Sequence, residues 1–312
     1  MSQSHPTNLA ASVRQRLLNL SVSKGEDPNL TLTRYAMERL LYRLTRSEYS
    51  EQFVLKGAML FALWTESPHR PTRDLDLLGF GEASNERLRE IFQRICEADV
   101  EPDGLEFDHT GVRSAEIREG QTYQGQRVKL VGLLGKARIP LQIDIGFGDA
   151  VTPDAQEIDY PTLLDLPAPR IRAYPPETVV AEKLQAMIAL GMQNSRMKDF
   201  FDLWVIARQF SFQGPVLVTA IQATFERRQT DLPKDIPTGL SDEFATDEQK
   251  LTQWTAFLTR SHLAESDMRL RQVVDELRNF LLPVLAAAEN GREFEHRWRN
   301  GGPWTSSNKN RT

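Results

Sequence analysis

The hydrophobic pattern of this 312-residue chain changes its period once, and that change sets the fold class. Between residues 52 and 147 apolar side chains come in short runs or alternate with polar ones, which is typical of β-strands. Beyond Pro175-Pro176 they recur every three or four residues almost to the end, which is typical of packed helices. The sequence therefore predicts an α/β (α+β) chain in which a mixed β-sheet with helices is followed by a helical part.

A proline-rich stretch separates the two patterns, with prolines at positions 153, 161, 167, 169, 175 and 176. Proline is well tolerated at the first helical position, so the last pair marks the start of a helix. We place a domain boundary near residue 165. The expected domains are residues 1–165, which include two N-terminal helices within residues 9–46, and residues 166–312.

The finer pattern predicts individual elements. Strands are expected at residues 53–55, 74–78, 105–109, 112–118, 126–134 and 138–147. Helices are expected at residues 58–64, 84–98, 177–190, 197–210, 215–229, 248–260 and 266–288. Thr33 is the predicted N-cap of the second N-terminal helix, and the chain from Gly301 onward is predicted to be a frayed tail.

Composition excludes several classes of protein and site. The single cysteine, Cys96, cannot form an intramolecular disulfide, and none of the 5 histidines has HxxxH spacing, so carboxylates are the expected metal ligands. The longest apolar run, Phe280 to Ala288, contains Pro283 and is far shorter than the roughly 20 residues that span a bilayer. The N-terminal residues lack the apolar core of a signal peptide. We therefore expect a cytoplasmic protein with no membrane partner.

The formal net charge of −5 conceals an uneven distribution. Residues 111–138 hold six Lys and Arg against two Asp and Glu, and residues 1–50 hold seven against four. These basic segments leave an RNA partner open. Within the second of them, Arg39, Arg43 and Arg46 form a stripe along a predicted helix, which is either a phosphate-facing patch or a solvated helix side.

The segment RDLDLL carries the strongest chemical signal. Because side chains alternate along a strand, Asp74 and Asp76 lie on one face while Leu75 and Leu77 point into the core. Two carboxylates this close destabilise a fold unless a cation lies between them, and Mg²⁺ is the natural candidate. The alternative is a solvent-facing acidic strand edge.

The surrounding residues favour the metal interpretation. The strand–turn–helix at Lys56-Gly57-Ala58 offers backbone N–H groups to a polyphosphate, and Arg70 and Arg73 flank the acidic pair. In the segment LQIDIGFGD, alternation places Asp144 on the polar face of its strand, beside Gln142. If that strand neighbours the acidic pair, three carboxylates converge, and Asp144 is then a general base or a metal ligand. The alternative for Asp144 is a strand-end residue bonded to a local turn.

The helical part adds a second group of charges. Lys183 shares its helix face with apolar residues, so its charge needs an anion. That anion is either a nucleotide triphosphate or an internal carboxylate. The alternative is that the side chain extends to the helix edge and reaches solvent. Arg196, Asp199 and Asp202 fall on one face of the next predicted helix. The sequence does not separate the contribution of Lys183 from that of Arg196 or Lys198.

Six segments in this order resemble the AbiEii/AbiGii toxin family of nucleotidyltransferases, which are toxins of type IV abortive-infection toxin–antitoxin systems and are similar in fold to DNA polymerase beta. They are ERLLYRL, FVLKGAMLF, RPTRDLDLL, LQIDIGFGD, EKLQAM and RMKDFFDL. The resemblance covers nearly the whole chain.

The resemblance implies an enzyme, a nucleotidyltransferase that uses an NTP and Mg²⁺. Gly57 matches the family's turn glycine, Asp74 and Asp76 its metal-binding pair, Lys183 its motif II lysine and Asp199 its acidic residue. The implied catalytic residues are thus Asp74, Asp76, Asp144, Lys183 and Asp199; the nucleotide-binding ones are Lys56, Gly57, Ala58, Arg70, Arg73, Lys183 and Arg196; and the metal ligands are Asp74, Asp76 and Asp144.

Related toxins transfer nucleotides to tRNA 3′ ends and so block translation, which implies an RNA acceptor, a role in phage defence and a cognate AbiEi-like antitoxin. Other relatives are described chiefly as GTP-binding, so a non-catalytic nucleotide-binding module is one alternative. A nucleotidyltransferase that modifies a small molecule is another. The chain departs from the usual Gly-Gly or Gly-Ser turn at Gly57-Ala58. The C-terminal Trp298 and Trp304 are either a stacking platform or a packed tail, and we favour the packed tail.

Overall fold

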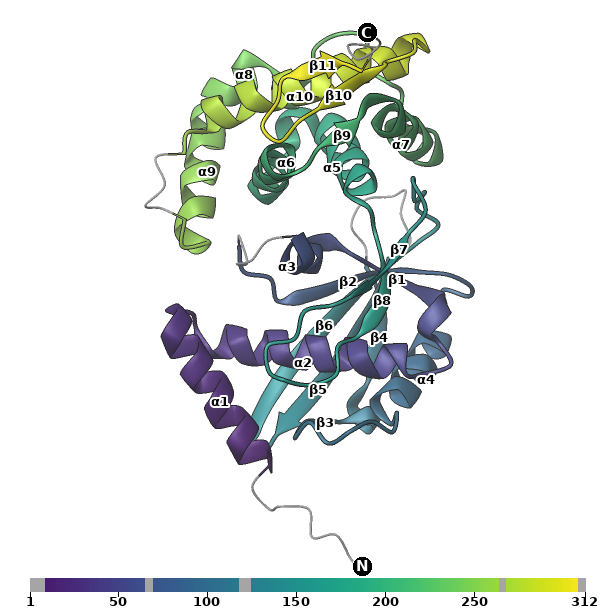
Figure 1. Cartoon of the computed structure of the whole chain (residues 1–312), viewed down its shortest axis with the longest axis vertical. Helices are drawn as coiled ribbons and strands as arrows, with labels where there is room; N and C mark the ends of the chain where they lie inside the picture. Colours follow the sequence, from purple (N-terminus) through teal and green to yellow (C-terminus); the bar gives the residue numbers. More distant parts are fainter. Residues whose placement is uncertain (1–8, 65–69, 118–124, 264–267, 308–312) are drawn as a thin grey trace, which may run out of the picture. The chain divides into compact units, whose positions relative to one another are not determined.

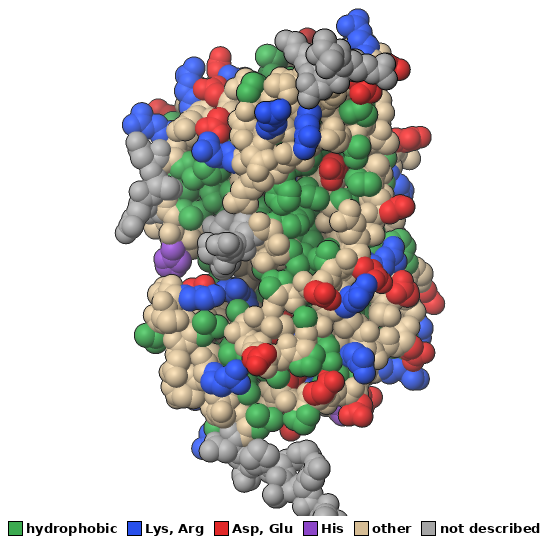
Figure 2. Space-filling model, viewed as in Figure 1, with side chains coloured by type: hydrophobic (Ala, Val, Ile, Leu, Met, Phe, Trp, Pro, Cys, Tyr) green, Lys and Arg blue, Asp and Glu red, His purple; other side chains and the backbone are tan. Residues whose placement is uncertain are grey.

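A computed structural model describes residues 9–64, 70–117, 125–263 and 268–307. The chain forms two compact units, Met1–Gly148 with Gln156–Ala173 and Asp149–Ala155 with Tyr174–Thr312 (Figure 1). On the face that Figure 2 shows, basic and acidic side chains are interspersed over both units. The predicted division into domains 1–165 and 166–312 stays a prediction.

The described strands of the first unit form an 8-stranded mixed sheet with the order β3-β5-β6-β2-β1-β8-β7, and β4 pairs with β5. Their bounds are β1 Phe53–Lys56, β2 Asp74–Gly79, β3 Glu106–Phe107, β4 Arg113–Ile117, β5 Gly125–Leu134, β6 Ala137–Phe147, β7 Gln156–Asp159 and β8 Arg170–Ala173. The central pair, β2 and β6, is parallel, whereas β1–β2 and β5–β6 are antiparallel. The predicted fold class is confirmed.

The described residues of the first unit also form four helices. They are α1 (Leu9–Lys24), α2 (Pro28–Thr45), α3 (Phe61–Trp64) and α4 (Asn85–Cys96), with short 3₁₀ turns η1 (Ser50–Gln52), η2 (Gly57–Leu60) and η3 (His109–Gly111). Helix α2 packs against β6 and β8, and α4 packs against β4 and β5 (Figure 1). Alternate residues of β5 and β6 are buried there, so the polar residues between them face the other way.

Two local predictions in the first unit are wrong. The second helix begins at Pro28 with Asp27 as its N-cap, because the Asp27 carboxylate accepts a hydrogen bond from the Asn29 backbone and proline suits the first helical position. Thr33 therefore lies inside the helix. The strand expected at residues 105–109 is limited to β3, because η3 turns the chain at His109.

Neither interpretation of the arginine stripe on α2 is correct for Arg39 and Arg43. Both are buried, because α2 is enclosed by the sheet and its flanking loops. Arg43 forms a bidentate ion pair with Asp103, at 2.7 and 3.1 Å, and Arg39 donates to the Pro167 carbonyl at 2.7 Å. Arg46 alone of the three is exposed. The guanidinium groups of Arg39 and Arg43 therefore bind partners inside the protein and do not face phosphate.

The second unit is mainly helical. Its helices are α5 (Pro176–Leu190), α6 (Met197–Gln209), α7 (Gly214–Arg227), α8 (Asp242–Thr246), α9 (Glu248–Arg260) and α10 (Leu270–Asn290), with 3₁₀ turns η4 (Gly191–Gln193) and η5 (Thr238–Leu240). The first residues of the predicted helix 266–288 lie outside the described residues. Among the described helices, none combines the length and hydropathy needed to cross a bilayer.

For residues 301–307 the expectation of a frayed tail is wrong, and residues 308–312 lie outside the described residues. Strands β9 (Phe212–Gln213), β10 (His296–Trp298) and β11 (Trp304–Ser306) form a small antiparallel sheet. Trp298 is 3% exposed and donates its indole N–H to the Ala207 carbonyl, while Trp304 stacks on Phe280. The prediction of a packed tail is confirmed, and the aromatic rings supply the apolar area that anchors the chain end.

A buried carboxyl group on α2 makes the stability of the first unit depend on pH. Glu38 is 1% exposed, and burial raises its pKa to about 7. One oxygen accepts from the Leu163 backbone at 2.7 Å. The other lies 3.2 Å from Arg39 Nε, but the geometry there gives neither atom a hydrogen bond.

We expect Glu38→Gln to make stability less dependent on pH. The folded-state pKa of Glu38 lies above the unfolded value, so its favourable contribution is present at low pH and is lost as pH rises towards about 7. Between roughly pH 5 and pH 8 the wild type loses up to about 3 kcal/mol relative to the variant. Urea unfolding of both proteins at the two pH values measures this. Equal changes with pH in the free energy of unfolding of the wild type and of the variant would contradict it.

Candidate functional site

A row of charged residues crosses the polar face of the first unit's sheet. Lys56 on β1 lies opposite Asp76 on β2, Asp76 lies opposite Asp144 on β6, and Asp144 lies opposite Arg127 on β5. Residues paired in a ladder point to the same side of a sheet. The structure thus brings two of the three predicted metal ligands side by side, between two cations.

The third predicted ligand belongs to the next row. Asp74 lies opposite Gln142, and its Oδ1 accepts a hydrogen bond from Gln142 Nε2 at 3.0 Å. Leu75 and Leu77, the alternating neighbours, are buried, so Asp74 and Asp76 share the polar face as the alternation predicts. Because β2 pairs with β6, the strand of Asp144 neighbours the strand of Asp74 and Asp76, which is the arrangement that the convergence of three carboxylates requires.

Arg127 is a site residue that the sequence analysis missed. Its Nε and Nη2 each donate to one carboxylate oxygen of Asp144 at 2.7 Å. The signal was present, because a two-residue turn at Gly135-Lys136 joins the two predicted strands and fixes their register. Counting back from that turn places Arg127 opposite Asp144.

Gly57 is required by the backbone at this site. Its φ is +73°, a conformation that side chains rarely allow, and an added Cβ would overlap the Asp76 carboxylate. Lys56 precedes it at the end of β1, and Ala58 follows it in η2. The close approach of the turn to Asp76 is consistent with the predicted nucleotide-binding role of these three residues, which stays a prediction.

The two predicted arginines lie on the segment that leads into β2. Arg73 is exposed and, together with Asp74, lines a groove on the sheet face. Arg70 is partly exposed. Their predicted role in binding phosphate is not tested by the geometry.

The donor atoms fit a hard divalent cation in kind. Carboxylate oxygens are the ligands that Mg²⁺ prefers, and the guanidinium of Arg127 now lies where a cation would meet Asp144. Over the described residues, no three Asp, Glu, His or Cys side chains are grouped so as to hold a metal ion. A cation shared by Asp144, Asp74 and Asp76 would compete with Arg127 for the Asp144 carboxylate, and the predicted metal site stays a prediction.

The second unit holds the other predicted residues in one cluster around two buried carboxylates. Lys183 Nζ on α5 lies 2.6 Å from Asp199 Oδ1 and 2.8 Å from Asp202 Oδ2 on α6, and Arg196 Nε lies 2.8 Å from Asp199 Oδ2. Burial raises the pKa of Asp199, but Lys183 and Arg196 outweigh it and hold that pKa below its usual value. Lys198 is exposed.

This cluster matches one of the alternatives for Lys183, the internal ion pair. The carboxylates of Asp199 and Asp202 are almost fully buried, so Lys183 supplies the charge they need. The roles of Lys183, Asp199 and Arg196 in nucleotide binding stay predictions, and any test must allow for this structural role.

A comparison with protein families agrees with the motifs. A family model described as "Nucleotidyl transferase AbiEii toxin, Type IV TA system" matches residues 39–279, more than half of the chain. Crystal structures of a "putative nucleotidyltransferase" from H. pylori (14% identity, covering 84% of this chain and 97% of that one) and of JHP933 from Helicobacter pylori (15% identity, 85% and 91%) are similar, each with a TM-score of 0.49. No curated protein matches at the level of significance applied.

We expect Gly57→Ala to destabilise the first unit more than Gly25→Ala does. Both glycines have positive φ, +73° and +63°, but an added Cβ at Gly25 meets nothing within 4 Å. Gly25→Ala thus measures the backbone cost alone, about 1 kcal/mol, and Gly57→Ala adds the clash with Asp76. Denaturant unfolding compares them, and equal losses would contradict the close approach.

We expect Lys183→Met to destabilise the second unit by about 3–5 kcal/mol, because the buried Asp202 and Asp199 each lose an ion pair, although Arg196 still pairs with Asp199. The exposed Lys198→Met is the matched control and should cost under about 0.5 kcal/mol. Adding Asp202→Asn to Lys183→Met should restore part of the loss. If Lys183→Met unfolds like the control, the ion pair is not structural.

Proposed function

We infer that this chain, which belongs to the AbiEii family of nucleotidyltransferase toxins of type IV toxin–antitoxin systems, transfers a nucleoside monophosphate from an NTP to an RNA acceptor with the help of Mg²⁺. The proposed acceptor is the tRNA 3′ end, whose modification blocks translation. The proposed setting is the cytoplasm, in phage defence, opposed by a cognate AbiEi-like antitoxin.

One observation carries the proposal: Asp76 lies between Gly57 and Asp144, with Asp74 on the same face of β2. A glycine turn beside a pair of carboxylates, with a third carboxylate on the neighbouring strand, suits the binding of a metal-bound polyphosphate next to a group that can accept a proton. Each of these features lies within the first unit.

In the proposed reaction, the acceptor hydroxyl oxygen bonds to the α-phosphorus of the NTP, and the bond from that phosphorus to pyrophosphate breaks. Asp144 accepts the proton of the acceptor hydroxyl. Asp74 and Asp76 would hold divalent cations, which supply positive charge to the phosphates and to the leaving pyrophosphate. Gly57 leaves room for the turn to lie against Asp76.

The Arg127–Asp144 ion pair has two consequences for this reaction. It keeps the Asp144 carboxylate fixed on the polar face of β6, where the acceptor hydroxyl must come. It also gives each Asp144 oxygen one hydrogen bond, which leaves a further lone pair on each oxygen for a proton or a cation. The turn residue Ala58 carries no hydroxyl for the phosphates, so the turn can bind them only through its backbone N–H groups.

The decisive test uses Asp74→Asn and Asp76→Asn with each labelled NTP, Mg²⁺ and total tRNA. We expect the wild type to label tRNA with at least one NTP and each variant to lose at least about 100-fold in rate, because charge stabilisation at the phosphates is lost. Asp159→Asn, on exposed β7, is the matched control and should be fully active.

Two results would contradict the proposal. If the folded wild type transfers no nucleotide to RNA but binds GTP, the chain is a nucleotide-binding module. If label passes to a small molecule and never to RNA, the acceptor class is wrong. Toxicity in cells gives an independent readout, since an enzymatic toxin loses toxicity in the Asp74→Asn and Asp76→Asn variants.

A further inference from the structure

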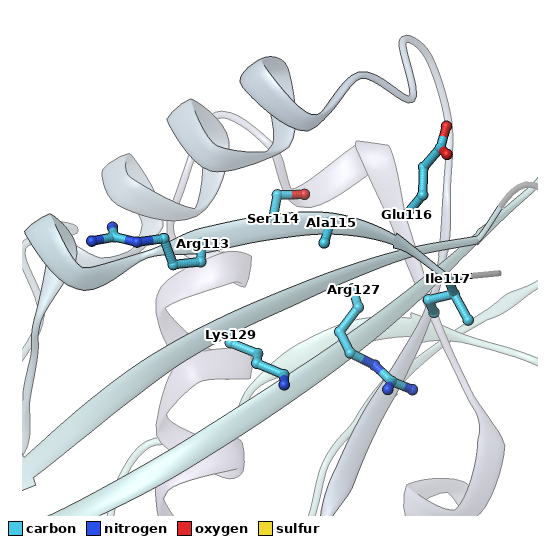
Figure 3. Close-up of a pocket in the computed structure, with 7 residues that line it drawn as sticks. All are labelled: Arg113, Ser114, Ala115, Glu116, Ile117, Arg127 and Lys129. Atoms are coloured by element: carbon cyan, nitrogen blue, oxygen red, sulfur yellow. The ribbon is translucent and has the colours of Figure 1, made fainter.

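A groove leads away from the acidic pair across the same sheet face. It has a volume of about 430 Å³ and is lined by Arg73 and Asp74 at one side and by Arg113 and Lys129 at the other. A second hollow, of about 300 Å³, continues from it and shares Arg113 and Lys129 (Figure 3). The two hollows form one continuous surface over β4, β5 and β6, which we call the basic groove.

The ladder fixes the order of residues along the basic groove. Asp74 lies opposite Gln142, Gln142 opposite Lys129, and Lys129 opposite Arg113. Neighbouring strands are about 4.8 Å apart, so Arg113 lies roughly 14 Å from the acidic pair along this row. In Figure 3, Lys129 and Arg127 extend to the same side of the sheet, while Ser114 and Glu116 point to the other.

The opposite face is not available to a ligand. There Ser114 donates to Asn85 at the start of α4, which packs against β4 and β5. The basic groove lies on the face that the helices α2 and α4 leave open, and this is the face that carries Asp74, Asp76 and Asp144.

Within the described part of the chain, three cations of the basic groove have no carboxylate partner, although Asp74 and Glu116 also line the two hollows. Arg73, Arg113 and Lys129 are exposed, and none forms an ion pair with a carboxylate of the described residues. Arg113 donates only to the carbonyls of Thr110 and Val112. Arg127 differs, because Asp144 already pairs with it. A row of such cations, spaced along an open groove, suits a ligand with repeated negative charges.

We propose that Arg113 and Lys129 bind the sugar–phosphate backbone of the RNA acceptor strand, a few nucleotides before its reacting 3′ end. The assignment rests on the proposed function, which places that end at Asp74, Asp76 and Asp144. A strand that ends there and continues outward crosses β6, β5 and β4 in turn, and so meets Gln142, Lys129 and Arg113. These contacts hold the acceptor by charge and shape, without reading bases.

The test measures tRNA binding by the full chain, without NTP, over a range of salt concentrations. We expect Lys129→Ala and Arg113→Ala each to weaken binding about three- to tenfold and to reduce the slope of log affinity against log salt by about 0.7–0.9, as for one lost phosphate contact. Lys129→Arg keeps the charge and should bind like the wild type.

Lys136→Ala is the matched control, because it removes one exposed cation from the β5–β6 turn of the same sheet. It should leave the affinity and the slope unchanged. Binding of NTP alone should be the same in all variants, and thermal unfolding checks that each is folded.

The proposal is overturned if the wild type binds no tRNA, if Lys129→Ala and Arg113→Ala bind it with wild-type affinity and slope, or if they lose only the binding of an acidic partner protein. Its failure is distinct from failure of the proposed function. Nucleotide transfer to tRNA that is unaffected by these variants rejects the basic groove alone, whereas tRNA binding through the groove without any transfer rejects the enzymatic function alone.

Discussion

The parallel pairing of β2 with β6 is the contact on which the rest of the candidate site depends. It places Asp76 beside Asp144 and Asp74 beside Gln142, and it buries Leu75, Leu77, Ile143 and Ile145 on the other side. A shift of β2 by one residue would move Asp74 and Asp76 to the buried face and Leu75 and Leu77 to the polar face. The hydrophobic face therefore fixes the position of the charges.

The two units use buried charge in the same way. In the first, Arg43 is held by Asp103 inside the packing of α2; in the second, Lys183 is held by Asp199 and Asp202 between α5 and α6. Removing one partner of such a pair leaves an uncompensated buried charge, which costs more than the pair contributes. Charged residues with a motif-like appearance therefore carry structural duties here, and activity data on them must be read together with stability data.

The Arg127–Asp144 pair joins the two functions that we propose for the sheet face. Arg127 lies between the acidic residues and the basic groove, and its guanidinium balances Asp144 in the absence of other cations. A phosphate entering from the groove and a cation entering at Asp74 and Asp76 would each favour the separation of this pair.

Periodicity in the sequence by itself determined the mixed sheet, the helical second half, and the shared face of Asp74 and Asp76, because alternation and helical spacing are local properties of neighbouring residues. It did not predict β7, β8 or the β10–β11 pair; β8 is held by β1 and β10 by β9, which are partners distant in the chain. Only the tertiary structure decided that Arg39 and Arg43 are buried, that Asp144 is bound by Arg127 and that Lys183 lies between two carboxylates. The physical reason is that the partner of a charged group is selected by packing between distant segments, and a pattern of neighbours along the chain does not contain that information.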